Sequence, residues 1–223
     1  MDLNLGITGP AQSNDIYHFT GRVGDRPNDV PEHIRIMTPQ QRLDAILSEG
    51  VLRAFPPFGV DFPCACFSKS TSEHLAFLVK NWKVKPWGIV TGQGSVFRLG
   101  GGAVAYVPDD QYEKFKRLGR WAVRVGANST WMHEREWRIP RKSGVIRLEG
   151  LRAVLLGDAS WRPSRVETEE WINPETGEPC QGPGEAPNAR PREDYPALWR
   201  ESAIWVWDDK SDTVIKYPPG ALR

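Results

Sequence analysis

The stretch that decides the predicted fold is Trp131-Met132-His133-Glu134-Arg135-Glu136-Trp137-Arg138-Ile139, which is closed by Pro140. Successive side chains of a β-strand point to opposite faces. On a strand through this stretch, Glu134, Glu136 and Arg138 share one face, and the bulky apolar residues share the other. Such a strand either lines a cleft with its charged face or is a half-exposed edge strand. On the charged face, Arg138 is also placed to neutralise Glu136.

Length and composition predict one cytoplasmic domain. The chain has 223 residues, which is enough for a domain with a real core. Charge is nearly balanced, with 29 Lys and Arg against 28 Asp and Glu, so composition alone does not favour nucleic acid as a partner. No apolar run is long enough to span a bilayer and no signal peptide is recognisable, which favours a cytoplasmic protein.

The numbers and spacing of cysteine and tryptophan residues argue against disulfides and a zinc site and in favour of buried indoles. The three cysteines are Cys64, Cys66 and Cys180, an odd number that does not suit a disulfide framework. No second Cys or His pair lies at zinc-finger spacing, so we predict no metal. The chain also has 10 Trp residues, which predicts several buried indoles or an aromatic-lined cleft.

Local patterns predict both helices and strands. Thr38 and Gln41 form a capping box for a helix that ends at Gly50, and Ser70 with Glu73 indicates a second helix start. Early helices and later strands indicate an α+β fold. We expect strands over residues 15–20, 64–69, 87–91, 95–99, 103–107, 121–125, 131–139 and 145–156.

The chain is expected to form a single domain over residues 1–223, with its core in residues 15–160. Residues 161–200 are rich in Pro and Gly and predict a mobile excursion. After it, two short apolar runs flank Asp-Asp-Lys-Ser-Asp, which predicts a C-terminal hairpin over residues 203–217.

Three short motifs follow one another in a familiar order. They are Tyr17-His18-Phe19-Thr20-Gly21, then Phe67-Ser68-Lys69-Ser70-Thr71-Ser72, then Glu134-Arg135-Glu136. Over roughly residues 15–140, this series resembles the plan of the ADP-ribosyltransferase fold, in its His-led branch. More locally, four segments resemble bacterial abortive-infection proteins of the AbiGi kind: Ala65-Cys66-Phe67-Ser68, Trp87-Gly88-Ile89-Val90, Ala103-Val104-Ala105-Tyr106-Val107 and Glu134-Arg135-Glu136-Trp137-Arg138.

The resemblance implies two antiparallel sheets splayed around an NAD cleft, with short flanking helices. It implies an NAD-dependent ADP-ribosyltransferase that consumes NAD, needs no metal and transfers ADP-ribose to nucleic acid or protein. It also implies a bacterial toxin or anti-phage defence effector of the toxin–antitoxin or abortive-infection type. An antitoxin or chaperone is then a candidate partner for the Pro-rich excursion.

The first motif would bind NAD. By resemblance, the imidazole of His18 holds the adenosine ribose. The backbone of the following residues holds the nicotinamide amide, and the candidates here are Phe19, Thr20 and Gly21. His18 also has an ordinary explanation as a half-buried histidine of a strand.

The second and third motifs would complete the site. The resemblance implies that the second motif supplies either an aromatic that stacks on nicotinamide or a Ser-Thr-Ser that braces the site. Phe67 and Ser68 match best, with Ser70-Thr71-Ser72 as the alternative. Core packing for Phe67 and helix capping for the serines are the ordinary explanations. Glu136 matches the catalytic carboxylate and Glu134 the preceding acidic position, and which of the two is catalytic stays open.

The chemistry suits these groups. Cleavage between the ribose and nicotinamide passes through an oxocarbenium-like state, which a nearby carboxylate stabilises. Two other functions remain open: a non-catalytic module that binds nucleic acid or a nucleotide, and an NAD glycohydrolase.

His74 is expected at the surface. A further set is either a basic–aromatic surface for nucleic acid or a solvated face over buried indoles: Arg117, Arg120, Arg124, Arg135, Trp121 and Trp131.

Overall fold

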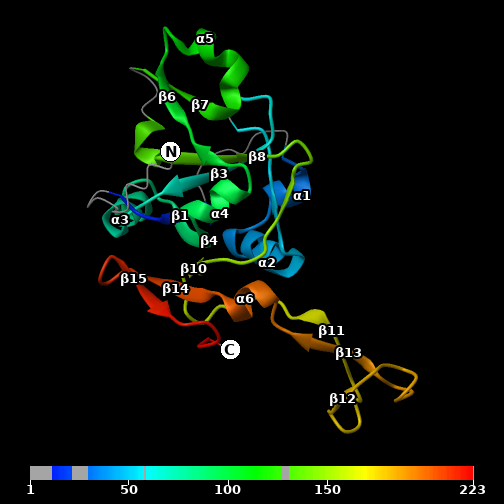
Figure 1. Cartoon of the computed structure of the whole chain (residues 1–223). Coiled ribbons are helices and arrows are strands. Elements are labelled where there is room, and N and C mark those ends of the chain that lie inside the picture. The colour runs from blue at the N-terminus through cyan, green and yellow to red at the C-terminus, as the bar shows by residue number, and fades with distance from the viewer. Residues whose placement is uncertain (1–11, 22–29, 58, 127–130, 223) are drawn as a thin grey trace, which may run out of the picture.

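The computed structural model describes residues 12–21, 30–57, 59–126 and 131–222 and has an α+β fold. Its largest sheet is built from β1 (Asp15–Gly21), β3 (Cys64–Lys69), β4 (Lys85–Gly92), β5 (Gly102–Ala103), β8 (Glu136–Pro140), β10 (Ala153–Leu156), β14 (Ala203–Asp208) and β15 (Thr213–Tyr217). The strand order is β15-β14-β10-β4-β1-β3-β8-β5 (Figure 1). Neighbouring strands of this sheet are antiparallel, except for the parallel pair β10–β14.

Smaller sheets and short helices surround this sheet. The small sheets pair β2 (Val51–Arg53) with β9 (Val145–Arg147), β6 (Ala105–Pro108) with β7 (Ala122–Val125), and β11 (Val166–Ile172) with both β12 (Pro179–Cys180) and β13 (Arg190–Asp194). The helices are α1 (Glu32–Arg35), α2 (Pro39–Glu49), α3 (Ser72–Lys80), α4 (Gln93–Arg98), α5 (Tyr112–Phe115) and α6 (Ala197–Glu201), with 3-10 turns η1 (Lys116–Trp121) and η2 (Trp131–Glu134). No helix of the described residues has the length and apolar character needed to cross a bilayer.

The helix starts follow from local side-chain capping. The predicted capping box of α2 is confirmed, because Gln41 N donates to Thr38 Oγ1 at 3.2 Å and Thr38 N donates to Gln41 Oε1 at 2.8 Å. Gly50 ends the helix with a φ of 65°, a conformation that glycine adopts without a Cβ clash. Helix α3 begins later than predicted, because the capping residue is Thr71.

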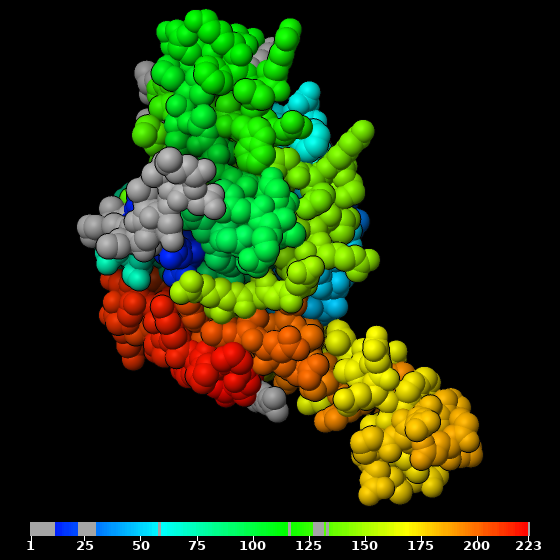
Figure 2. Space-filling model, viewed as in Figure 1, coloured from blue at the N-terminus to red at the C-terminus, as the bar shows by residue number. Residues whose placement is uncertain are grey.

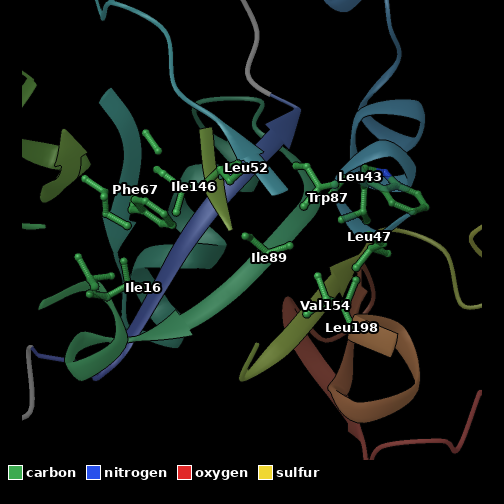
Figure 3. Packing of buried hydrophobic residues seen from close by; sticks show 14 of the residues in the cluster. Ile16, Leu43, Leu47, Leu52, Phe67, Trp87, Ile89, Ile146, Val154 and Leu198 are labelled. Carbon is green, nitrogen blue, oxygen red and sulfur yellow. The ribbon is translucent and has the colours of Figure 1, made fainter. Parts of the chain in front are cut away.

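Two hydrophobic clusters cover the two faces of the large sheet. Consecutive residues contribute to opposite clusters, as strand alternation requires: Ile16 and Ile89 lie in one, and Tyr17 and Val90 in the other. Helix α2 packs Leu43 and several neighbours against the first cluster (Figure 3). Five of the described indoles are buried, namely Trp87, Trp137, Trp199, Trp205 and Trp207.

The structure corrects several sequence predictions. The α+β class is confirmed, but one large mixed sheet, with small sheets beside it, stands where two splayed antiparallel sheets were expected. The predicted strand 95–99 is largely helix α4, and the predicted strand 145–156 divides into β9 and β10. The predicted strand 131–139 starts only at Glu136. The C-terminal hairpin is confirmed by the antiparallel pairing of β14 with β15.

Residues 161–200, which sequence predicted as a mobile excursion, contain regular structure. Strands β11, β12 and β13 form a three-stranded antiparallel sheet. In the space-filling view this sheet extends away from the rest of the molecule (Figure 2). The other described strands form the body to which the predicted site belongs.

Candidate active site

The three strands that carry the sequence motifs are neighbours in the large sheet. Strand β3 lies between β1 and β8, in antiparallel pairing with both. Tyr17 lies opposite Ser68, and Ser68 in turn lies opposite Glu136. Segments that are far apart in the chain are therefore brought to one region of the sheet.

The ladder between β1 and β3 opens at the predicted histidine. Only two residue pairs join these strands, Ile16 with Lys69 and Tyr17 with Ser68, whereas β1 keeps six pairs with β4. The His18 Nδ1 atom lies 2.8 Å from the carbonyl oxygen of Cys66. Because a carbonyl only accepts, Nδ1 carries the proton of this bond. Beyond Tyr17 the β1 backbone no longer pairs with β3, and the His18 imidazole bonds the Cys66 carbonyl instead.

The residues after His18 are engaged by the scaffold. Phe19 is 8% exposed and packs in the second cluster. Thr20 Oγ1 donates to the carbonyl of Trp87 at 3.1 Å, and the Thr20 carbonyl accepts from Arg42 Nε at 2.8 Å. The Phe19 side chain therefore belongs to the core and does not face a ligand directly.

Gly21 allows a close approach of chain segments at the end of β1. An added Cβ would lie 2.5 Å from the Lys85 Cβ and 3.2 Å from the Pro39 Cγ. No side chain fits at that position without a shift. The glycine therefore serves the packing of β1 against β4 and α2.

The second motif supplies core packing and buried hydroxyls. Phe67 is 2% exposed and lies in the first cluster, and its ring centroid is 5.4 Å from that of His18. Ser68 and Ser70 are 1% and 0% exposed, with their Oγ atoms 3.0 Å apart. Ser68 Oγ also donates to the carbonyl of Glu134. The motif thus links the His18 strand to the acidic motif.

The acidic motif begins in a turn and not in a strand. Glu134 ends η2, and Arg135 has a φ of 44°, which is the left-handed region that non-glycine residues rarely occupy. Glu136 is the first residue of β8, and its N–H donates to the Tyr106 hydroxyl oxygen at 2.6 Å. Glu136 and Arg138 share a face as predicted, but Glu134 precedes the strand.

A buried ion pair dominates the electrostatics of β8. Arg138 Nε lies 2.9 Å from Glu136 Oε1, and the two side chains are 4% and 8% exposed. Burial works against the charge of Arg138, but the neighbouring Glu136 carboxylate outweighs it and holds the pKa of the guanidinium above its usual value. Burial also raises the pKa of Tyr106 to about 12 and that of Cys64 to about 11. Both groups therefore keep their protons at neutral pH.

Two residues of this region were not predicted. Tyr106 carries no signal in the sequence, because its bond to Glu136 spans thirty residues. His74 was expected at the surface, which is wrong: its Nδ1 lies 3.0 Å from Ser70 Oγ and it is part-buried. Ser70 lies just before the N-cap Thr71 and His74 lies in the first turn of α3, so the short separation of the two residues was the signal that could have revealed this contact.

The basic residues of the predicted nucleic-acid surface are partly used within the protein. Arg124 pairs with Asp109 at 2.9 Å and lies over the Tyr112 ring. The Arg120 guanidinium lies over the Phe62 ring, 5.1 Å from its centroid. The ion pair of Arg124 is solvent-exposed, and exposed pairs of this type contribute little to stability.

A cavity of about 420 Å³ lies elsewhere. It is lined by residues around α2, the start of β4 and the segment after β10, and includes none of the predicted site residues: Pro39, Gln40, Lys85, Trp87, Gly157, Asp158 and Trp161. Within the described ranges, no three His, Cys, Asp or Glu side chains are grouped to hold a metal ion.

Comparisons with known proteins leave the family open. The chain matches no protein-family model, no curated protein and no solved structure.

Proposed function

We propose that this protein is an NAD-dependent ADP-ribosyltransferase that transfers ADP-ribose from NAD to nucleic acid or protein. One observation carries the proposal: the three motifs lie on or directly beside the adjacent strands β1, β3 and β8, and the β1–β3 ladder opens at His18. The opening divides the large sheet into two groups of strands joined by two residue pairs, which supports a derivative of the splayed two-sheet plan.

In this reaction the bond between ribose C1′ and the nicotinamide nitrogen breaks, and its electron pair leaves with neutral nicotinamide. A nucleophile of the acceptor forms the new bond to C1′ and releases its proton. Glu136 is the catalytic carboxylate, which stabilises the developing positive charge on the ribose. His18 orients the adenosine ribose, and the backbone after it holds the nicotinamide amide.

Arg138 orients Glu136 for this role. The guanidinium donates to both carboxylate oxygens and so fixes the direction in which the carboxylate points. A carboxylate has about four acceptor positions, so two bonds from Arg138 leave two for a ribose hydroxyl. Because the Glu136 side chain is only 8% exposed, the ribose has to approach it closely. Glu134 flanks this site from the preceding turn.

The test is incubation with NAD, with nicotinamide release measured for wild type, Glu136→Gln, Glu134→Gln and His18→Ala. We expect release to fall by about 10²–10³-fold in Glu136→Gln, with a smaller effect in Glu134→Gln. Melting curves and NAD titration by calorimetry control for folding and binding. A wild-type protein that releases no nicotinamide contradicts the proposal.

The acceptor and the biological role follow from labelled NAD. Incubation in a bacterial lysate, followed by separate protease and nuclease digestion, assigns the label to protein or nucleic acid. Nicotinamide release without labelled macromolecule indicates an NAD glycohydrolase, and retained nucleic-acid affinity without NAD turnover indicates a binding module. Growth arrest on expression, lost in Glu136→Gln, is the result expected of a toxin or anti-phage defence effector.

A further inference from the structure

A chain of hydrogen bonds runs from helix α3 to the acidic motif. His74 Nδ1 lies 3.0 Å from Ser70 Oγ, and Ser70 Oγ lies 3.0 Å from Ser68 Oγ. Ser68 Oγ then reaches the carbonyl oxygen of Glu134, which is 66 residues away in the sequence. The two serines are fully buried, so water does not compete for these bonds.

The direction of every bond in this chain is fixed by its last member. The Glu134 carbonyl only accepts, so the single hydroxyl proton of Ser68 is used there. Ser70 must therefore donate to Ser68, which uses the only hydroxyl proton of Ser70. His74 is then the donor to Ser70, and its Nδ1 carries a proton. With a proton on Nδ1, the imidazole donates to Ser70, so the Ser70 proton is free for Ser68 and the Ser68 proton is free for the Glu134 carbonyl.

The chain ends beside a strained residue. Arg135 has a φ of 44°, and such a conformation in a non-glycine residue persists when its surroundings hold it. Ser68 holds the carbonyl before it, Lys69 N donates to the Arg135 carbonyl at 3.1 Å, and Tyr106 accepts from Glu136 N–H. These bonds set the direction in which the chain enters β8 and therefore where Glu136 points.

We propose that His74 is a positioning residue, which acts through Ser70 and Ser68 to hold the turn that orients Glu134 and Glu136. The inference rests on the proposed function for its catalytic consequence. His74 lies outside the three motifs, on α3, and the resemblance assigns it no role. Its stacking on Phe77, with ring centroids 6.3 Å apart, keeps the ring in place on α3.

The structural half of the proposal is tested without NAD. Hydrogen–deuterium exchange is measured for peptides covering residues 131–140 in wild type, His74→Phe, His74→Leu and His74→Asn. Phe keeps an aromatic ring and Leu has approximately the shape of Asn, but neither has an N–H that can donate to Ser70. Asn carries such an N–H near the position of Nδ1. We expect about three- to tenfold faster exchange in the Phe and Leu variants and exchange near wild type in the Asn variant.

The control is His33→Phe, an equivalent change at an exposed histidine of α1, which should leave exchange in this segment unchanged. Unchanged exchange in both the Phe and the Leu variants overturns the proposal. It is also overturned if Asn behaves as Leu does, because the donor is then not what matters. Using two donor-free variants keeps the test decisive if one of them does not fold.

The catalytic half is tested by nicotinamide release. In His74→Phe we expect kcat to fall about tenfold with KM for NAD nearly unchanged, and His74→Asn to restore kcat. An active wild type whose kcat is unaffected by His74→Phe overturns the positioning role. A wild type with no release defeats the proposed function instead, and the exchange data alone then decide whether His74 holds the turn.

Discussion

Arg138 donates to both carboxylate oxygens of Glu136, from Nε at 2.9 Å and from Nη2 at 3.2 Å. Its remaining Nη1 donates to the carbonyl of Gly119 at 3.0 Å, in the segment that precedes β7. The pair therefore joins β8 to the segment that covers its charged face. Both side chains are almost fully buried, so removing one partner leaves the other charge buried and unpaired, which lowers the free energy of unfolding.

Arg138→Met should lower the free energy of unfolding by about 3–5 kcal/mol, because it leaves the Glu136 carboxylate buried and uncompensated. The double variant Glu136→Leu/Arg138→Met should recover most of that loss, since no charge is then buried alone. Urea unfolding followed by tryptophan fluorescence measures both. The control is Arg192→Met, which breaks an exposed pair with Glu170 and should cost less than about 1 kcal/mol. A similar small loss in Arg138→Met would contradict the interpretation.

Gly88→Ala should destabilise the protein by about 1–3 kcal/mol or more. Gly88 lies opposite Phe19 in the β1–β4 ladder, and an added Cβ would lie 2.1 Å from the His18 carbonyl oxygen. Because the obstacle is backbone, β1 has to move, and His18 moves with it. Thermal melting measures the loss. Gly150→Ala, in the segment between β9 and β10 with open space around it, should change stability by less than about 0.5 kcal/mol. Equal effects at the two glycines would exclude steric contact as the cause.

Local chemistry explains which elements were predictable. The capping box at Thr38 and Gln41 is contained within four residues, and the structure contains both of its bonds. Helix α4 was missed because six residues cover less than two helical turns, and alternating burial of Val96 and exposed Phe97 suits a strand equally well. Short apolar segments do not carry enough periods to distinguish the two.

Non-local contacts explain the rest. The left-handed conformation of Arg135 ends the predicted strand, and no residue type in that stretch indicates it. It is held by Ser68, Lys69 and Tyr106, which come from other parts of the chain. The joining of β1 and β3 into one sheet likewise depends on two residue pairs. The strands that carry the predicted site residues, β1, β3 and β8, are neighbours in the sheet, but the residues that hold the turn before β8 were not predictable from local pattern.

Stability should fall as pH rises above about 9. Burial raises the pKa of Cys64 to about 11 from an ordinary value of 9.0, so between these values the folded chain keeps a proton that the unfolded chain loses. The stabilisation is complete below pH 9 and is lost as pH approaches 11. Burial of Tyr106, with a pKa of about 12, extends the loss to higher pH. Urea unfolding at pH 8 and pH 10.5 should show a smaller difference for Cys64→Ala than for wild type. Equal differences would show that Cys64 does not contribute.

Arg135→Val should lower the free energy of unfolding by about 1–2 kcal/mol more than Arg135→Gly does. Both changes remove the same guanidinium, so the difference between them isolates the backbone: a β-branched residue is strained at a φ of 44°, and glycine is not. Urea unfolding measures the pair. Lys83 has a φ of 55° in a segment outside the candidate site, and Val and Gly there should differ by a similar amount. If Val and Gly are equivalent at residue 135 but not at residue 83, the turn before Glu136 does not need its left-handed residue. The positions of Glu134 and Glu136 would then have to be set by β8 alone.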